Sequence, residues 1–150
     1  MNIAPTSGQF HHGVHRFPIR VYFEDTDFSG IVYHANYLRF MERARSDMLR
    51  LAGIDQVATY RAGEGVYAVA AMDIKYKRPA RLDDVLIVES RVTRVRAAAT
   101  EIEQLILLKG ELAVSALVTA ALVGPEGRPM RQPQGWKDEF NSLMKQAKGE

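Results

Sequence analysis

Hydrophobic and polar residues alternate along several stretches of this chain, a pattern that predicts half-buried β-strands. In the first stretch, Phe17, Ile19, Val21 and Phe23 recur at every second position. Four more stretches rich in apolar residues follow after residue 65, and short turn signals separate them. The five expected strands span residues 15–23, 66–78, 85–96, 100–109 and 112–123. Because short turns join the last four, we expect these strands to run antiparallel.

A helical pattern interrupts the strands between residues 36 and 52. Its apolar positions recur at spacings of three and four and are Tyr37, Met41, Ala44, Met48 and Leu51. Further apolar residues widen this stripe, so we expect most of the helix to be buried. We expect Asn36 to be its N-cap and Gly53 its C′ residue. Arg43 and Asp47 are four positions apart and are expected to pair on the exposed side.

The order of one strand, one helix and four strands favours an α+β fold. The economical arrangement is a curved antiparallel sheet of about five strands wrapped around one long central helix. The strand at 112–123 is almost wholly apolar, which predicts that it is covered on both faces or lies at a subunit contact. A single helix cannot cover both faces of the sheet, so we expect a second subunit to cover the rest.

The domain is expected to span residues 14–135. Residues 1–13 are polar and without periodicity, which predicts a mobile tail, and residues 136–150 are expected to form a C-terminal helix or tail. His11, His12 and His15 lie close together near the tail. No acid or cysteine lies near them in the sequence to complete a ligand set, so we expect solvated histidines and no metal site.

Composition and charge limit the possible classes of function. The chain has 150 residues, of which 47% are hydrophobic, enough for one domain with its own core. The net charge of +2 does not predict nucleic-acid binding. The sequence contains no cysteine, which excludes disulfides, thiolate catalysis and cysteine-based zinc sites. It shows neither a secretory signal nor an apolar stretch long enough to span a bilayer, so we expect a cytoplasmic protein.

Residues 22–45 carry the candidate chemistry, because two aspartates and a histidine stand between a strand and a helix. Asp27 is either a nucleophile or general base, or simply a turn acid, and a structural role is the better interpretation of Asp25. Gly30 supplies a positive φ or a close approach to a ligand. His34 is either satisfied within the loop or offers a backbone N–H whose effect the helix dipole strengthens.

Four charged residues outside this loop are further candidates. Glu42, inside the helix, can act as a base in a cleft, although a solvated or arginine-paired carboxylate is the more frequent situation. Arg78, Arg81 and Arg128 lie next to or near prolines and can bind phosphates. Ordinary surface charge is the better explanation for any single one of these arginines.

The segment Glu-Asp-Thr-Asp-x-x-Gly-x-Val-Tyr-His-x-x-Tyr-Leu, followed by Glu-Arg-Ala-Arg, resembles the motif of the hot-dog-fold acyl-CoA thioesterases. The resemblance spans residues 24–45 and is closest to the Tol–Pal-associated branch, which is related to the 4-hydroxybenzoyl-CoA thioesterases. The strand order over residues 15–123 agrees with a hot-dog fold, in which an antiparallel sheet wraps a long helix. The N-terminal tail and the C-terminal helix fall outside the resemblance.

The resemblance implies hydrolysis of an acyl-CoA thioester to a free acid and CoA, without a metal or organic cofactor. It places the catalytic carboxylate at Asp27, the carbonyl-polarising donor at the backbone N–H of His34, and an acyl-lining side chain at Tyr33. Asp27 would either attack the carbonyl to give a mixed anhydride or activate water. The family also implies dimers that pair into homotetramers, active sites at a subunit boundary, and a link to the Tol–Pal envelope system.

The acyl group and its carrier, CoA or an acyl-carrier protein, stay open at this point, and so do two other functions. A hot-dog hydratase or dehydratase uses a histidine and a carboxylate in differently spaced motifs, which this sequence does not contain. A non-catalytic acyl-CoA-binding module is the second alternative. The complete set of Asp27, Gly30 and His34 argues against it.

Overall fold

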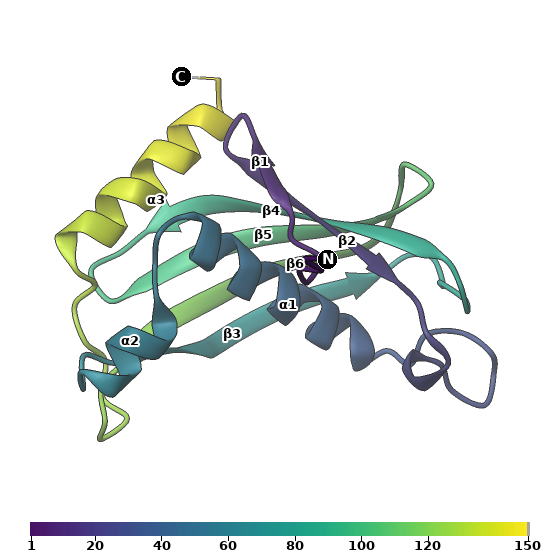
Figure 1. Cartoon of the computed structure of the whole chain (residues 1–150), viewed down its shortest axis with the longest axis horizontal. Coiled ribbons are helices and arrows are strands. Elements are labelled where there is room, and N and C mark those ends of the chain that lie inside the picture. Colours follow the sequence, from purple (N-terminus) through teal and green to yellow (C-terminus); the bar gives the residue numbers. More distant parts are fainter. Residues whose placement is uncertain (150) are drawn as a thin grey trace.

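A six-stranded antiparallel sheet forms the main layer of the protein, whose computed structural model describes residues 1–149 (Figure 1). In chain order the strands are β1 (Gln9–His11), β2 (Val14–Arg20), β3 (Val66–Tyr76), β4 (Val85–Val95), β5 (Ala99–Leu108) and β6 (Glu111–Val123). Across the sheet the order is β1-β2-β4-β5-β6-β3, so β1 and β3 form its two edges. All five predicted strands are present, and β1 is an additional strand.

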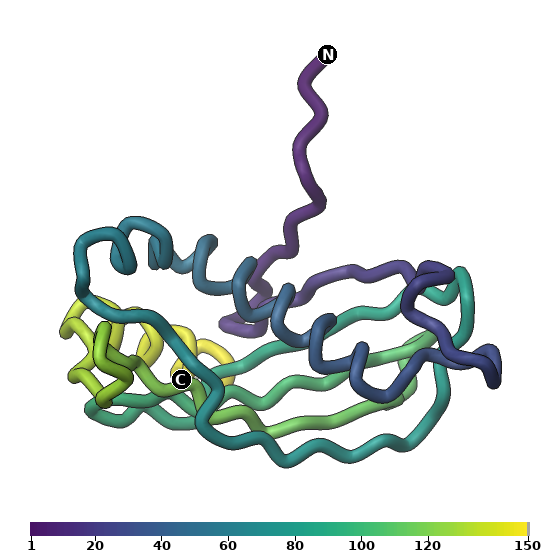
Figure 2. The backbone as a smooth tube through the Cα atoms, turned by 90° about the horizontal axis from the view of Figure 1, so that it is seen from below, coloured from purple at the N-terminus to yellow at the C-terminus, as the bar shows by residue number. Residues whose placement is uncertain are grey.

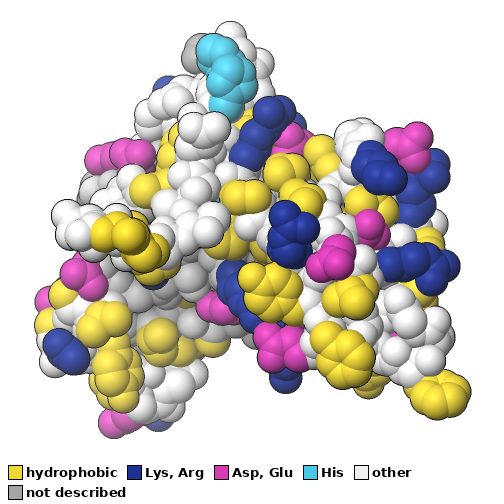
Figure 3. Space-filling model, turned by 45° about the vertical axis from the view of Figure 1, so that its right-hand side comes forward, with side chains coloured by type: hydrophobic (Ala, Val, Ile, Leu, Met, Phe, Trp, Pro, Cys, Tyr) yellow, Lys and Arg dark blue, Asp and Glu magenta, His cyan; other side chains and the backbone are white. Residues whose placement is uncertain are grey.

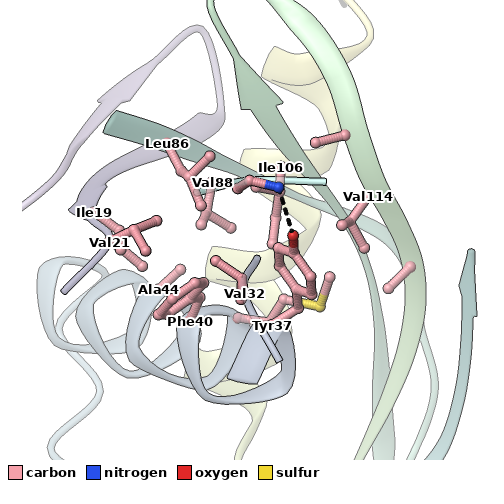
Figure 4. Packing of buried hydrophobic residues seen from close by; sticks show 14 of the residues in the cluster. Ile19, Val21, Val32, Tyr37, Phe40, Ala44, Leu86, Val88, Ile106 and Val114 are labelled. Atoms are coloured by element: carbon pink, nitrogen blue, oxygen red, sulfur yellow. Dashed lines mark hydrogen bonds between the residues drawn. The ribbon is translucent and has the colours of Figure 1, made fainter. Parts of the chain in front are cut away.

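Helix α1 (Asn36–Leu51) lies along one face of the sheet, as the side view in Figure 2 shows. Its apolar stripe is buried as predicted except at Leu51, which is 45% exposed at the end of the helix, and Phe40, Met41 and Ala44 have no exposed surface. The strand side chains in the same core cluster include Leu86, Val88, Ile106 and Val114 (Figure 4). Gly53 follows the helix with a φ of 86°, as a C′ residue requires. The predicted hot-dog fold is therefore confirmed.

Helix α3 (Gln134–Ala147) packs against β4 and forms a second core with the end of α1. Phe140 of α3 is buried there with Met48, Leu49 and Ile102. The short helix α2 (Gln56–Arg61) lies on the connection from α1 to β3. The C-terminal segment is thus a helix that closes one end of the core. None of the helices within residues 1–149 is long and apolar enough to cross a membrane.

The predicted tail over residues 1–13 is too long, because β1 pairs with β2 through a tight turn. Gly13 in this turn has a φ of 78° and lies against α3, where an added Cβ would be 2.3 Å from the Leu143 carbonyl oxygen. The turn therefore requires glycine. Only the first few residues of the chain extend away from the domain (Figure 2).

His15 is fully buried in β2 and is not a solvated tail residue as expected. Its Nε2 lies 2.7 Å from Oδ2 of Asp47 on α1, and the same oxygen accepts a hydrogen bond from the Gly8 N–H at 2.8 Å. The predicted pairing of Arg43 with Asp47 on the exposed face of the helix is wrong. Asp47 is buried and takes hydrogen bonds from Ser7 and Gly8, in the segment that was expected to be mobile, and from His15. The arginine near it is Arg50, at 3.8 Å.

Strand β6 is covered on only one face within this chain. Val118 is buried in the core that α1 completes, whereas Leu117 is 44% exposed on the opposite face of the sheet. At the edge, β3 has β6 as its only neighbour in the sheet of residues 1–149. Coverage of both faces of β6, which the sequence suggested, therefore requires a second chain.

Candidate active site

Asp25 joins the two ends of the loop that precedes α1. It belongs to a short 3-10 turn, η1 (Phe23–Asp25), and only 4% of it is exposed. Its Oδ2 accepts the Tyr22 N–H at 2.8 Å, and its Oδ1 accepts Nδ2 of Asn36 at 2.6 Å. Asn36 is therefore not the N-cap as predicted: the cap position is Ala35, and the Asn36 side chain points back to the loop. The structural interpretation of Asp25 agrees with these contacts.

Asp27 is exposed on the same loop and is held by its neighbours in a turn. Its Oδ1 accepts hydrogen bonds from the Ser29 Oγ at 2.5 Å and the Ser29 N–H at 2.8 Å. Gly30 donates its N–H to the Asp27 carbonyl and has a φ of 83°, as predicted for a turn glycine. Oδ2 of Asp27 has no hydrogen-bond partner within residues 1–149, so one carboxylate oxygen is open to a ligand.

The Asp27 carboxylate is ionised at neutral pH. The Ser29 side chain and then the Ser29 backbone N–H lower its pKa from the ordinary value, and the charge of nearby His34 lowers it further. Partial desolvation acts in the opposite direction but is smaller than the Ser29 contributions. A charged carboxylate with a free oxygen can act as a nucleophile or as a general base.

His34 lies directly before α1 and supplies the second part of the site. Its backbone N–H takes no acceptor within residues 1–149, while its carbonyl accepts the Tyr76 hydroxyl at 3.2 Å. The helix dipole makes such an N–H a good donor to a developing negative charge. The sequence predicts that His34 and Asp27 lie near each other. The lowering of the Asp27 pKa by His34 agrees with this prediction.

Aromatic rings surround the His34 side chain. The Tyr33 ring lies 4.7 Å from the His34 ring, and the Tyr76 ring, from the end of β3, lies 6.1 Å from it. Tyr33 is 47% exposed, so it is free to line a ligand site next to the loop. Sequence reasoning missed Tyr76, because no local pattern connects it with a residue 42 positions earlier. It also missed Ser29, although Asp-x-Ser at a turn is a recognisable hydrogen-bonding pattern.

Of the three predicted arginines, the structure places only Arg81 in direct contact with the Asp27 loop. The backbone of Arg81 forms a β-bridge with that of Ile31. Beside it, the Val32 N–H donates to the Ala80 carbonyl. Arg78 is paired with Glu111 at 2.9 Å. Arg128 lies in the turn after β6, where β6 pairs with the start of β3, at the other end of the sheet. A single chain therefore does not bring the three arginines together.

The surface around the Asp27 loop is unusually apolar. The exposed side chains in and near the loop include Tyr22, Phe23, Phe28 and Leu82, with Phe28 and Phe23 more than 80% exposed. Figure 3 shows hydrophobic side chains on this side of the molecule, with Lys and Arg between them. Such a surface is typical of a ligand or protein contact.

A cavity of about 130 Å³ lies between α1, the start of β3 and α3. Its walls are mainly apolar, and its polar lining includes Glu42, Arg45 and Tyr67. Glu42 accepts a hydrogen bond from the Ser46 hydroxyl at 2.7 Å, so the predicted site residue lines this cavity and is not beside Asp27. Between Asn36, where α1 begins, and Glu42 the helix advances about 9 Å, given its rise per residue.

The geometry supports acyl chemistry at the N-terminal end of α1. It combines an ionised carboxylate at Asp27 with an unpaired N–H donor at His34, the two groups that a reacting carbonyl needs. No three His, Asp or Glu side chains within residues 1–149 are arranged to hold a metal ion.

Comparison with known proteins gives consistent matches. Residues 21–142 match the family model described as the Thioesterase-like superfamily. The chain is 38% identical over 128 residues to the acyl-CoA thioesterase YbgC of Haemophilus influenzae, a match that covers 85% of this chain and 94% of that protein. It is 39% identical over 127 residues to the acyl-CoA thioester hydrolase YbgC of Escherichia coli O6:H1, covering 83% and 94%. A probable thioesterase from Bartonella henselae superposes with a TM-score of 0.76 at 41% identity, covering 80% of this chain and 99% of that one.

Proposed function

The chain belongs to the thioesterase-like superfamily, and we propose that it hydrolyses acyl-CoA thioesters to a free acid and CoA at Asp27. The observation that supports the site is that the ionised Asp27 carboxylate and the His34 N–H, which has no acceptor within residues 1–149, lie on the same loop before α1. The two relatives are named as an acyl-CoA thioesterase and an acyl-CoA thioester hydrolase, and each match covers most of this chain. This similarity supports the proposed reaction.

In the proposed reaction the thioester carbonyl oxygen accepts the His34 N–H. The free Oδ2 of Asp27 either attacks the carbonyl carbon or takes a proton from a water molecule that does so. The C–S bond breaks in both routes, and CoA leaves as a thiolate that needs no strong acid to stabilise it. In the water route, the water molecule supplies the second oxygen of the product acid. In the anhydride route, water that attacks the Asp27 carbonyl carbon leaves its oxygen on Asp27, and the product acid keeps the bridging oxygen. Incorporation of ¹⁸O from labelled water into the Asp27 carboxylate would identify the mixed-anhydride route.

Replacement of Asp27 tests this proposal. We expect Asp27→Asn to lower kcat for acyl-CoA hydrolysis by about 10²–10⁴-fold, because the amide is neither a nucleophile nor a base. The assay follows thiol release from a panel of acyl-CoAs. The matched control is Asp138→Asn, an exposed acid on α3 that only accepts from Gln134. Full activity of the Asp27 variant would refute the assignment, provided that its circular dichroism and thermal unfolding match the parent protein.

We extend the proposal to a two-fold dimer formed through β3. This edge strand is 11 residues long and exposes Val66, Val69 and Tyr76. An uncovered strand edge of this length readily pairs with another strand. Antiparallel pairing of two β3 strands would bring Tyr76 of the partner subunit opposite the start of β3. Because Tyr76 lies beside His34 and the start of β3 lines the cavity, each Asp27 loop would face the cavity of the other chain.

In this dimer the CoA-binding residues come from both chains. Arg81 pairs through its backbone with Ile31 in the Asp27 loop of its own chain, and it is the proposed phosphate-binding residue of that chain. Arg128 lies at the cavity end of the sheet, which would adjoin the partner's loop, so it remains a proposed second contact. Arg78 can contribute only by giving up its pair with Glu111.

The sequence and its resemblance to the thioesterases suggest four further properties, which we also propose for this protein. We propose that two dimers pair into a tetramer, for which the exposed outer face at Leu117 offers a surface. We further propose a cytoplasmic location, acyl-CoA or acyl-carrier protein as the substrate carrier, and a functional connection with the Tol–Pal envelope system. Chromatography with light scattering tests the tetramer, and turnover of matched acyl-CoA and acyl-carrier-protein substrates tests the carrier.

A further inference from the structure

Arg45 is half-buried in the wall of the cavity beneath α1, and its charge has no acidic partner. Its Nη1 donates to Oε1 of Gln104 at 2.9 Å, and it forms no ion pair within residues 1–149. A guanidinium has five N–H donors in a fixed planar arrangement, so one neutral acceptor satisfies only a small part of it. Each nitrogen of Arg45 either has a hydrogen-bond partner or is accessible to solvent. The donors without a partner therefore face the cavity or its mouth.

Gln104 fixes the position of this guanidinium. Gln104 is fully buried, and its Nε2 donates to the Met41 carbonyl at 3.0 Å and to the Ser90 hydroxyl at 2.9 Å. Because the amide nitrogen is held by two acceptors, the amide oxygen has to point toward Arg45. The arginine is therefore held in place by a rigid core residue, as a recognition group needs to be.

Four of the other polar side chains of the cavity already have hydrogen-bond partners, whereas the Gln56 side chain, which also lines it, has none within residues 1–149. The hydroxyls of Tyr67 and Thr100 both donate to Oε1 of Gln132, and Ser46 donates to Glu42. Most of the remaining lining is apolar and comes from Leu49, Val69, Ile102, Ala120 and Phe140. Arg45 is thus the charged donor of this cavity, and within residues 1–149 Gln104 is the one acceptor that its guanidinium reaches. Burial lowers its pKa, with Glu42 acting in the opposite direction, so an added acceptor would offset part of the cost of burying the charge.

We infer that Arg45 makes this cavity select acyl groups that carry an uncharged oxygen, a hydroxyl or oxo group, at their distal end. The inference rests on the proposed function, because it treats the cavity as the acyl site. Apolar walls accept the methylene chain, and the guanidinium donates to the oxygen. The Glu42 carboxylate lines the same cavity and would repel a second carboxylate, so we expect dicarboxylic acyl groups to bind less well than hydroxylated ones.

Three acyl-CoAs of equal chain length test this inference: hexanoyl-CoA, 6-hydroxyhexanoyl-CoA and adipyl-CoA. For the parent protein we expect kcat/KM to be about tenfold or more higher for the hydroxylated substrate than for hexanoyl-CoA, as a hydrogen bond to a charged group predicts. In Arg45→Met this ratio should fall to about one. The matched control is Arg50→Met, an exposed arginine on the same helix that does not line the cavity, and its ratio should stay at the parent value.

Two further measurements keep the result interpretable. If Arg45→Met does not fold, Arg45→Lys retains the charge but loses the planar donor pair, and its ratio should lie between the parent value and one. Binding is followed separately in Asp27→Asn through the fluorescence of Trp136, the single tryptophan, whose ring lies 5.8 Å from that of Tyr67. This readout does not require turnover.

The outcomes separate the inference from the proposed function. Equal kcat/KM for hexanoyl and hydroxyhexanoyl substrates in the parent protein would overturn the inference and leave the thioesterase assignment intact. An unchanged preference in Arg45→Met would also overturn it. Absence of hydrolysis for every acyl-CoA would overturn the proposed function, and the fluorescence titration would then still decide whether Arg45 recognises the distal oxygen.

Discussion

At the scale of single residues, the proposed site depends on how Ser29 holds Asp27. Two hydrogen bonds to Oδ1 fix the carboxylate and favour its charged form, while Oδ2 stays open. Asp25, two positions earlier, is buried, and its two oxygens accept from the Tyr22 N–H and the Asn36 side chain, which agrees with the predicted structural role. Two neighbouring acids thus differ in role because they differ in burial and in hydrogen-bond partners.

Removal of the Ser29 hydroxyl should change the pH dependence of the reaction. The hydroxyl is the largest cause of the lowered Asp27 pKa, so Ser29→Ala should raise that pKa toward its ordinary value. Asp27 is active as the anion, so the acidic limb of the kcat/KM–pH profile should move to higher pH, with a small change in the neutral plateau. Ser142→Ala on α3 serves as control. An acidic limb that stays in place or moves to lower pH would contradict the proposed role of Asp27.

At the scale of elements, α1 has different functions along its length. The His34 N–H lies just before its N-terminal end. Arg45, in its middle, lines the cavity. The buried Asp47 contacts His15 of β2 and so holds the N-terminal strands against the helix. In this last contact His15 is neutral, because burial lowers its pKa more than Asp47 raises it. Burial opposes the charge of Asp47, but the hydrogen bonds from His15, Gly8 and Ser7 together lower its pKa.

This contact predicts that acid destabilises the fold in two steps. The folded-state pKa of His15 lies below its ordinary value of 6.5, so stability should fall as the pH drops below about 6.5 and the unfolded state binds the proton first. The folded-state pKa of Asp47 lies below 3.8, so its contribution is present above 3.8 and is lost as the pH falls through the folded-state value.

Replacement of Asp47 tests the strength of this contact. Asp47→Asn should lower the free energy of unfolding at pH 7 by about 1–3 kcal/mol, because buried donors lose a charged acceptor. It should also remove the second, more acidic step while the His15 step remains. Urea unfolding between pH 3 and pH 8 measures both effects, and Asp73→Asn on the exposed side of β3 is the control. An unchanged midpoint at pH 7 would show that the contact contributes little.

The same elements show which features could be predicted from the sequence. Helix α1 and five strands were predictable because their signals are local repeats of apolar residues. The edge strand β1 and the burial of His15 were not, since they depend on Asp47, 32 residues away, and on packing against α3. Asp27, Gly30 and His34 were identified as candidates through one contiguous motif. Arg45 stands in that motif as well, but only the cavity and Gln104 suggest a role for it.

At the scale of the whole molecule, the described chain keeps two parts of the proposed site apart. Asp27 and His34 lie at one end of α1, and the cavity lies toward the other end, with about 13 Å of helix between Asn36, where α1 begins, and Arg45. A short acyl group cannot extend over this distance within one chain. A two-fold axis beside β3 would solve the problem for both chains at once, because it exchanges the two ends of the strand.

The symmetry of this dimer gives a specific test at Ala71, the middle residue of β3. A two-fold axis at the centre of the paired strands places Ala71 next to Ala71 of the partner subunit, and the residue is exposed in the single chain. Ala71→Glu or Ala71→Lys alone should weaken the dimer, because like charges on directly opposite strand residues repel. Both variants should also lose activity in proportion, since each Asp27 loop would lose the cavity of the other chain.

An equimolar mixture of the two variants should restore both the dimer and the activity, because Glu then lies opposite Lys. Sedimentation velocity and thiol release measure the two quantities on the same samples. The matched pair for comparison is Ser142→Glu and Ser142→Lys, at an exposed position on α3 outside the sheet and outside both proposed interfaces. If the Ala71 mixture stays monomeric, or if monomers retain full activity, the β3 edge does not complete the active site. Recovery confined to the Ala71 mixture would place the two-fold axis at β3 and the catalytic carboxylate of one chain beside the acyl cavity of the other.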